Sequence, residues 1–217
     1  MNIIVLGPQG SGKGTQVQLL VEKYGFNRVE MGDILRSIAT SDNPKAEEVR
    51  GFMNRGELVP DEFVRLLVWD HINKQDKEKG FIFDGYPRSL AQFEQVSDML
   101  RKFGKRIDLV LSLKLSEDET IKRLSARRTC EKCGKIWNLI TNPPSTEEFC
   151  ECKGRLLQRV DDQPEAIKIR LKTFSEKTVA ILDTASKEGI LREVDGEQPI
   201  AKIHEDIVKV LKDYEQS

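Results

Sequence analysis

Short apolar runs recur along the chain and predict buried strands. Residues 2–6 (Asn-Ile-Ile-Val-Leu) and residues 81–83 (Phe-Ile-Phe) have no polar interruption after Asn2, and β-branched or aromatic side chains dominate them. Runs of this length and composition are typical of strands inside a core. The other predicted strands cover residues 26–31, 107–113 and 190–194, with shorter extended segments at 135–140 and 156–160.

Between these runs, apolar residues recur at every third or fourth position, which predicts amphipathic helices. The predicted helices cover residues 16–24, 32–38, 45–54, 61–74, 89–103, 116–128, 164–188 and 199–211. Ser116 with Glu119 forms a capping-box pattern. Pro164 stands in the first turn of the long helix, after a cap formed by residues 161–163, and Gly189 ends that helix. Alternating strands and helices predict an α/β fold.

Length and charge narrow the class of protein. With 217 residues the chain can bury a sizeable core, as one domain or one domain with inserts. The 35 basic and 36 acidic residues give a net charge of -1, so we expect neither a nucleic-acid nor a membrane partner. No apolar run approaches the roughly 20 residues of a membrane span. The first residues enter a strand directly, so we expect no secretory signal and a cytoplasmic protein.

A glycine-rich stretch, G-P-Q-G-S-G-K-G-T at residues 7–15, joins the first predicted strand to the first predicted helix. Its glycines let successive backbone N–H groups face one anion, and the helix N-terminus adds further donors. Lys13 is then placed to reach β- and γ-phosphate oxygens. Gly14 separates this lysine from Thr15, a departure from the usual pattern. The alternative is a simple turn between strand and helix, but the spacing, the lysine and the flanking elements favour a phosphate-binding loop.

Asp84 follows the predicted strand 81–83 and is the candidate magnesium partner. In a parallel sheet the carboxyl ends of the strands line the ligand crevice, and a carboxylate beside a phosphate loop suits Mg²⁺, directly or through water. The alternative is an aspartate that starts a tight turn with Gly85, and both roles can hold together.

Three arginines lie near the end of the predicted helix 116–128, at positions 123, 127 and 128. Arg123 and Arg127 are four residues apart and would share a helix face, where like charges repel. An anion between them therefore explains the pair better than helix stability does. The alternative is a solvated basic face.

All four cysteines lie within residues 130–152. Cys130 and Cys133 have C-x-x-C spacing, and Cys150 and Cys152 have the tighter C-x-C spacing. Two pairs of thiolates suit a tetrahedral structural Zn²⁺ with no open position. This confined pattern favours a metal site in a reducing compartment over a disulfide framework. The alternative is four unrelated free thiols.

Taken together, these motifs resemble the adenylate kinases, in the form with a long, cysteine-rich lid. They occur in the family's order along almost the whole chain: residues 7–15, G-D-I-L-R at 32–36, D-G-Y-P-R-S-L-A-Q at 84–92, R-L-S-A-R-R at 123–128, N-P-P at 142–144 and Q-R-V-D-D-Q-P-E at 158–165. The resemblance implies a three-layer α/β core of the P-loop nucleoside monophosphate kinase type, built on a parallel sheet. It assigns residues 1–29, 60–125 and 163–217 to the core, 30–59 to a helical AMP-binding insert and 126–162 to a small β-rich lid.

The resemblance also implies an activity and its partners. The reaction is ATP + AMP ⇌ 2 ADP, with Mg²⁺ bound to ATP, a structural Zn²⁺ in the lid, and closure of lid and insert over the substrates. The expected partners are ATP, AMP and ADP. A monomer is the default expectation, and an oligomer stays open.

The site residues follow from the same resemblance. The expected catalytic residues are Lys13, Arg88, Arg123, Arg159 and Arg170. The expected ATP contacts are Gly10, Ser11, Gly12, Lys13, Gly14, Thr15, Arg123, Arg127, Ile136, Trp137 and Gln198. The expected AMP contacts are Met31, Arg36, Glu57, Leu58, Val59, Gly85, Arg88, Gln92, Arg159 and Arg170. Asp84 would order Mg²⁺ through water, Asp161 and Asp162 would contact arginines as the lid closes, and Cys130, Cys133, Cys150 and Cys152 would hold the zinc.

One position departs from the family's motif, and two other functions stay open as alternatives. Met31 stands where a hydroxyl residue is usual, which weakens one adenine contact, whereas Gln92 would read the adenine edge. The nearer alternative is a kinase for GMP or for UMP and CMP. The more distant one is a P-loop ATPase or switch with a nucleic-acid-binding zinc knuckle. The neutral charge and the lack of interleaved aromatic residues argue against the latter.

Overall fold

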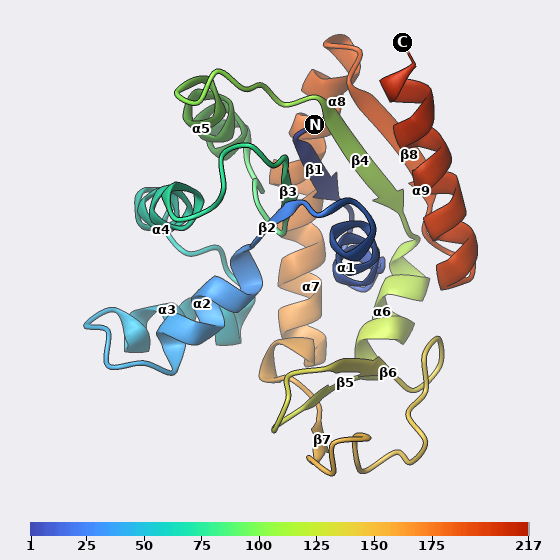
Figure 1. Cartoon of the computed structure of the whole chain (residues 1–217). Helices are drawn as coiled ribbons and strands as arrows, with labels where there is room; N and C mark the ends of the chain where they lie inside the picture. The colour runs from blue at the N-terminus through green and yellow to red at the C-terminus, as the bar shows by residue number, and fades with distance from the viewer. Residues whose placement is uncertain (217) are drawn as a thin grey trace.

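The structure is a computed structural model that describes residues 1–216, and its larger sheet has five parallel strands (Figure 1). The strand order is β2-β3-β1-β4-β8, with β1 in the centre. The strands are β1 (Ile3–Leu6), β2 (Asn27–Glu30), β3 (Phe81–Asp84), β4 (Leu109–Lys114) and β8 (Leu191–Asp195). The parallel α/β core is thus confirmed, and the carboxyl ends of all five strands lie at one edge of the sheet.

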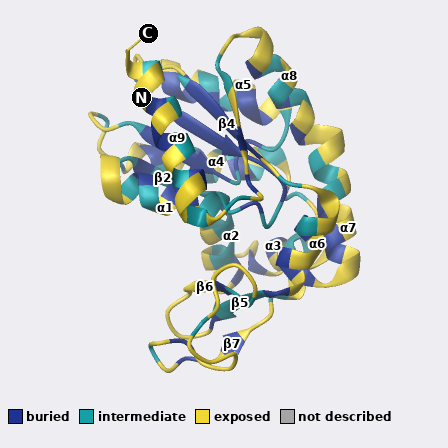
Figure 2. Ribbon diagram, turned by 90° about the vertical axis from the view of Figure 1, so that its right-hand side faces the viewer, coloured by how far each residue is buried: buried dark blue, intermediate teal, exposed yellow. Residues whose placement is uncertain are grey.

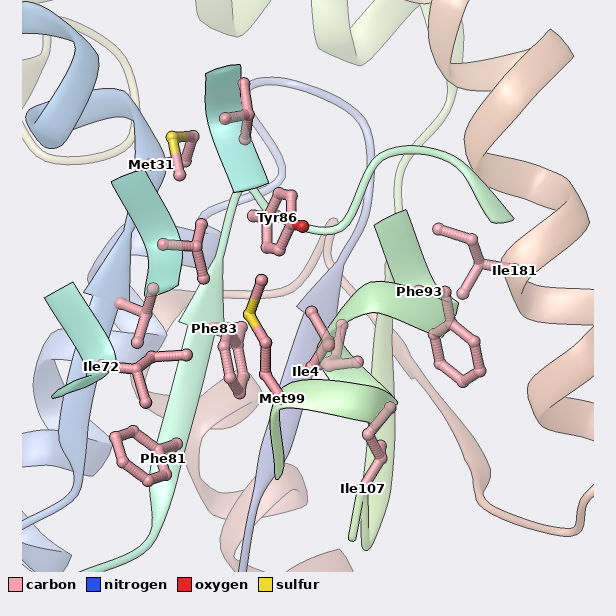
Figure 3. Packing of buried hydrophobic residues seen from close by; sticks show 14 of the residues in the cluster. Ile4, Met31, Ile72, Phe81, Phe83, Tyr86, Phe93, Met99, Ile107 and Ile181 are labelled. Carbon is pink, nitrogen blue, oxygen red and sulfur yellow. The ribbon is translucent and has the colours of Figure 1, made fainter. Parts of the chain in front are cut away.

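Helices cover both faces of this sheet. Ile3 and Val5 of β1 pack with α1 (Lys13–Tyr24) and α9 (Ile200–Glu215). The alternate residues of the strand pack on the opposite face, in the cluster that Figure 3 shows, together with α4 (Asp61–Asn73), α5 (Leu90–Arg101) and α8 (Val179–Lys187). Because side chains alternate along a strand, an apolar strand buries both faces and requires a helical layer on each.

Two smaller units extend from the core (Figures 1 and 2). The first, called the insert below, holds the helices α2 (Met31–Ala39) and α3 (Ala46–Arg55), and the second is called the lid. The second is an antiparallel sheet in the order β6-β5-β7, formed by β5 (Arg127–Cys130), β6 (Ile136–Asn138) and β7 (Leu156–Leu157). Figure 2 shows that most of this second unit is exposed. Its own buried cluster consists of Cys130, Trp137, Cys150 and Leu156, which is too small to be a conventional core.

The insert approaches α7 (Pro164–Thr173) closely at Gly56. This glycine has a φ of +73°, and a Cβ atom there would lie 2.8 Å from the carbonyl oxygen of Ala166. Any larger residue would force the insert away from α7. The end of the helical insert therefore lies directly against the helix that follows the lid.

The prediction of a helix through residue 128 was wrong. Helix α6 (Glu117–Ser125) ends before Arg127, which begins β5, so Arg123 and Arg127 do not share a helix face. The side chain of Asn138 explains the stop, because its amide donates to the carbonyl oxygen of Arg123 at 2.8 Å. Asn138 also pairs with Arg127 in the lid sheet, and this tertiary contact outweighs the local helical pattern.

Two further elements have boundaries that differ from those predicted from the sequence. The long helix is interrupted by a π-helical turn, η2 (Phe174–Thr178), between α7 and α8. The predicted strand 156–160 stops at Leu157, and a 3₁₀ turn, η1 (Val160–Asp162), follows it. Pro164 is the first residue of α7 as predicted, and Gln163 occupies the N-cap position without a side-chain hydrogen bond. Among the helices within residues 1–216, none has the length and apolar character needed to cross a bilayer.

Candidate functional site

The glycine-rich loop joins the carboxyl end of β1 to α1. Gly10 and Gly12 have φ angles of 84° and 89°, which glycine adopts without strain, and the helix begins directly afterwards at Lys13. A Cβ atom at Gly7 would lie 2.6 Å from the carbonyl oxygen of Leu113, so the loop lies tightly against β4. A curled glycine loop at a helix N-terminus is the geometry that binds phosphate.

Two polar side chains of this loop have no partner. Gln9 Oε1 and Ser11 Oγ are buried, and neither has a hydrogen bond in the described part of the chain. Buried polar atoms are normally paired, so orphaned ones in a loop point to a polar ligand. Gly14 is half-buried and Thr15 is exposed, both in the first turn of α1.

Lys13 folds back over the loop, and its Nζ donates to the carbonyl oxygens of Gly7 and Pro8, both at 2.8 Å. Burial lowers the pKa of Lys13 to about 7, while the negative charge of Asp84 opposes this shift. Further lowering of the pKa comes from the positive charges of Arg88, Arg170 and Arg127. The ammonium group is therefore held in a cationic, desolvated place where a phosphate would stabilise it.

Five arginines from the core, the insert and the lid share this neighbourhood: Arg36, Arg88, Arg127, Arg159 and Arg170. Burial lowers the pKa of Arg159 and of Arg170 to about 10, and the charge of Arg127 lowers both further. Burial also lowers the pKa of Arg88, and the charge of Arg36 adds to it. Burial is the main cause of each lowered pKa, and neighbouring positive charges add to it. A polyphosphate would supply the negative charge that such desolvated cations favour.

Two aspartates fix the lid arginine and the α7 arginine to each other. The carboxylate of Asp162 is fully buried and accepts from Nε of Arg127 at 2.7 Å and from its Nη2. Nη1 of Arg170 lies 3.3 Å from the same carboxylate and donates to Oδ2 of Asp161 at 2.8 Å. Asp162 thus contacts Arg127 and Arg170, and Asp161 contacts Arg170, whereas the sequence had named no particular arginine for either aspartate.

Sequence reasoning missed two charged residues on β2. Arg28 and Glu30 form an ion pair, and strand register places Glu30 beside Asp84. Oε1 of Glu30 lies 3.5 Å from Nη2 of Arg36, and Nη2 of Arg28 lies 3.8 Å from Oδ2 of Asp84. Burial raises the pKa of Glu30 to about 7, and the negative charge of Asp84 adds to this shift. The sequence did offer a signal for them, because two charged residues stand two positions apart near the carboxyl end of a predicted strand, where ligands bind in a parallel sheet.

The amide of Gln92, an expected AMP contact, is bonded to other groups of the protein. Its Oε1 accepts from the backbone N–H of Arg88 at 2.7 Å, and its Nε2 donates to Asp61 at 2.6 Å. Nε of Arg88 donates to the carbonyl oxygen of Gly85 at 2.7 Å. Gln92 is also buried, so these bonds fix the orientation of its amide.

The other expected AMP contacts lie around the insert. Arg36 on α2 is paired with Asp33. Met31 is buried in the cluster of Figure 3, Val59 is buried, and Leu58 is half-buried. Glu57 is exposed and paired with Arg55, with its Oε2 2.7 Å from Nη2. Met31 and Val59 thus belong to the same buried cluster, and Glu57 lies outside it.

Arg123, an expected ATP contact, is held beside the loop. Its Nε donates to Glu119 at 2.8 Å and its Nη1 to the carbonyl oxygen of Gly196 at 2.7 Å. A Cβ atom at Gly10 would lie 3.4 Å from that of Arg123, so helix α6 contacts the loop directly. Gln198 is anchored to Asp206, with Nε2 3.1 Å from Oδ2.

Two expected ATP contacts on β6 differ in exposure. Ile136 is 44% exposed, which leaves its side chain free for a ligand, whereas Trp137 is 5% exposed. The indole of Trp137 packs with the cysteines, and its Nε1 donates to Sγ of Cys150 at 3.4 Å. The side chain of Trp137 therefore faces the cysteine cluster.

The four cysteine sulfurs lie within 4.8 Å of one another. Cys130 and Cys152 have sulfurs 3.4 Å apart, and the sulfurs of Cys133 and Cys150 are 3.7 Å apart. A tetrahedral Zn²⁺ with Zn–S bonds of about 2.3 Å requires sulfurs about 3.8 Å apart, so the donor set fits zinc. A Cβ atom at Gly154 would lie 2.6 Å from Sγ of Cys130, which shows how tightly the chain wraps this cluster.

The place of Asp84 fits a magnesium ion bound to phosphate. Its side chain is buried at the carboxyl end of β3, and its Oδ2 would lie 3.3 Å from a Cβ atom at Gly14 of the loop. Burial raises the pKa of Asp84, whereas the charges of Lys13 and Arg28 lower it. A carboxylate pressed against a phosphate loop is the donor that Mg²⁺ uses together with water and phosphate oxygens.

Comparison with known proteins gives a consistent result. The family model described as adenylate kinase matches residues 5–190 of the chain. The adenylate kinase of Archaeoglobus fulgidus is 40% identical over 213 residues, which cover 98% of each chain. That of Thermodesulfovibrio yellowstonii is 41% identical over 213 residues, covering 98% of this chain and 99% of the relative. That of Bacillus pumilus is 37% identical over 212 residues, covering 97% and 98%.

Proposed function

The chain belongs to the adenylate kinase family and is a phosphotransferase that acts on ATP and AMP to give two ADP, and we propose that Lys13 with the five surrounding arginines is the site of transfer. The observation that carries this proposal is the glycine loop at the N-terminus of α1, with Lys13 folded over it and the charges of Arg88, Arg127 and Arg170 nearby. Phosphoryl transfer needs alignment and neutralisation of charge more than it needs a general base. Lys13 and the arginines around it meet both needs.

The two substrates would approach this group from opposite sides. The loop and Lys13 would hold the ATP phosphates, joined by Arg123 and Arg127. Arg36 and Arg88 would hold the AMP phosphate, which places the two phosphates in line across the end of the sheet. The adenine of AMP would lie against Met31 and Val59, and Gln92 would read its edge.

Closure of the insert and the lid completes the site in this proposal. Arg36 belongs to the insert, Arg127 and Arg159 belong to the lid, and the core supplies Lys13. The site is therefore whole only when all three units meet, and water is then kept from the transferring phosphoryl group. The ion pairs of Asp162 with Arg127 and Arg170 would hold the lid against α7 in that arrangement.

Mg²⁺ travels with ATP in this account, and Asp84 would order it through water. The ion would offset charge between the β- and γ-phosphates. Arg28 and Glu30 beside Asp84 would set the charge that surrounds this carboxylate. We also assign the four cysteines to a structural Zn²⁺ that folds the lid, because four sulfurs leave no position for water or phosphate.

The cellular setting is part of the proposal. The four cysteines lie together as a set of possible metal ligands, which suits a reducing compartment, and we place the protein in the cytoplasm as a monomer. Its partners are then small nucleotides and metal ions. The balanced charge of the chain gives no surface reason for binding nucleic acid.

A coupled assay tests the substrate assignment. ADP formation is measured with MgATP alone and with MgATP plus AMP, GMP, CMP or UMP in turn. We expect turnover to depend on the monophosphate and to be fastest with AMP. Hydrolysis of ATP alone at the same rate would instead support a P-loop ATPase, and a higher kcat/KM for GMP, CMP or UMP would support the neighbouring kinase classes.

A further inference from the structure

Trp137 is the one large aromatic side chain in the buried cluster of the lid, and it contacts the cysteine site through a polar atom. Its indole Nε1 lies 3.4 Å from Sγ of Cys150, and both residues are buried. Within residues 1–216 no other side-chain N–H is bonded to a cysteine sulfur. The indole therefore makes a directed contact with the sulfur in addition to filling space.

A positive charge lies over the ring of the same indole. Nζ of Lys135 lies 4.0 Å from the ring centroid, and it is also 2.8 Å from a carboxylate oxygen of Glu151. A cation over an aromatic ring draws on its electron density, which makes the ring N–H a better donor. Lys135, Trp137 and Cys150 thus form a chain of polarised contacts that ends on a sulfur.

The chemistry of a four-cysteine metal site explains why such a donor is useful. Zn²⁺ with four thiolates carries an excess of negative charge, and hydrogen bonds to the sulfurs spread that charge. Groups that bond to metal ligands also fix ligand orientation, and their removal typically lowers metal affinity about 10–100-fold. Cys150 belongs to the tight C-x-C pair, whose geometry leaves the chain little freedom to orient its sulfurs.

We propose that Trp137 is a positioning residue of the lid metal, whose indole N–H holds the Cys150 thiolate in its ligating orientation and thereby ties the metal to β6. This inference rests on the proposed zinc site. Strand β6 also carries Ile136, whose exposed side chain is an expected ATP contact. Metal retention and the shape of the ATP-side strand are coupled through one indole.

The chain offers a matched pair of variants, because it contains two tryptophans. Trp137→Phe keeps an aromatic ring but removes the N–H. Trp69→Phe is the control, since Trp69 lies on α4, packs against the core and stacks on Phe103 with ring centroids 5.7 Å apart. The holoproteins are mixed with a chromogenic zinc chelator at low temperature. We expect zinc release about tenfold faster or more from Trp137→Phe, and a wild-type rate from Trp69→Phe.

A spectroscopic readout separates a hydrogen bond from packing. Each protein is loaded with Co²⁺, whose sulfur-to-metal charge-transfer band reports electron density on the thiolates. Loss of an N–H···S bond raises that density, so we expect the band to move to longer wavelength in Trp137→Phe and to stay unchanged in Trp69→Phe. Faster release with an unmoved band would reduce Trp137 to a packing residue and overturn the proposal, as would wild-type behaviour in both measurements.

A measurement on the native indole covers the case in which Trp137→Phe does not form a lid. In the Trp69→Phe protein a single indole N–H remains, and its hydrogen exchange is followed by NMR with zinc bound and after chelation. We expect slow exchange with zinc and fast exchange without it. Equal exchange in both states would overturn the role of Trp137, whereas a wild-type protein that binds neither Zn²⁺ nor Co²⁺ would overturn the zinc site itself.

Discussion

Replacement of Asp162 by asparagine probes the junction between lid and core most directly. The carboxylate of Asp162 is fully buried and pairs with Arg127 of the lid and Arg170 of α7. Asparagine has the same shape but no charge, so both guanidinium groups lose their shared counter-ion. Their side chains are themselves only 14% and 11% exposed, which limits how far water can replace the carboxylate.

The size of the effect follows from this geometry. Removing one partner of a buried ion pair costs about 3–5 kcal/mol, and the remaining amide oxygen and the partial exposure of the arginines reduce this to about 2–3 kcal/mol. In a chain of this length each kcal/mol lowers Tm by about 2–4 °C, so Asp162→Asn should lower Tm by about 4–12 °C. The loss should be concentrated in the lid.

Two probes localise the effect. In the Trp69→Phe background the fluorescence of Trp137 reports on the lid, and far-UV circular dichroism reports on all helices. Asp162→Asn should lower the fluorescence midpoint more than the dichroism midpoint. The control Glu62→Gln removes an exposed partner of Arg65 and should change neither curve. Adding Arg127→Met to Asp162→Asn should regain part of the lost stability, because one unpaired cation disappears. If Asp162→Asn melts like the control, the carboxylate is not the counter-ion of this junction.

Four further outcomes follow from the site. Lys13→Met should be more stable than wild type, and the difference should grow as pH falls from about 10 to about 7. In wild type the unfolded chain protonates Lys13 over this range, whereas the folded state, in which its pKa is lowered to about 7, keeps the lysine neutral. A difference in Tm that is the same at both pH values would contradict this. Glu30→Gln should lower the KM for AMP about two- to fivefold, since it removes a negative charge 3.5 Å from Arg36, and a raised KM would refute the reasoning. Met31→Thr should raise the kcat/KM ratio of AMP over GMP, CMP and UMP by restoring a hydroxyl, whereas an unchanged ratio would mean that Gln92 and packing alone select the base. Cys130→Ser and chelation should each remove zinc and lower Tm but leave activity at low temperature, and inactivity of the still-folded protein would contradict a structural metal.

The pattern of apolar residues was sufficient to predict the core strands and the position of the glycine-rich loop. The uninterrupted runs at 2–6 and 81–83 became neighbouring parallel strands, and Lys13 opens α1 directly after the glycines. These features depend on local sequence and on burial, which a single chain displays openly. The spacing of the cysteines likewise placed all four sulfurs together.

What sequence reasoning missed depends on contacts between distant residues. The end of α6 is decided by the amide of Asn138, which lies beyond the helix in sequence and reaches back to the carbonyl of Arg123. The pair of Arg28 and Glu30 gains its meaning from the strand that pairs beside it, since register alone brings Glu30 to Asp84. The indole of Trp137 faces the cysteines because β6 pairs with β5 in one register. Such pairings are set by the fold and leave no local pattern.

A comparison of rates shows whether Lys13 serves the transferring phosphates. ADP produced from MgATP and AMP is quantified by chromatography for wild type, Lys13→Ala and the control Lys23→Ala, whose lysine is exposed on the same helix. We expect two ADP for each AMP consumed. Lys13→Ala should keep its fold but lower the rate about a hundredfold or more, whereas Lys23→Ala should keep the wild-type rate. A folded Lys13→Ala protein that turns over at nearly the wild-type rate would contradict this expectation.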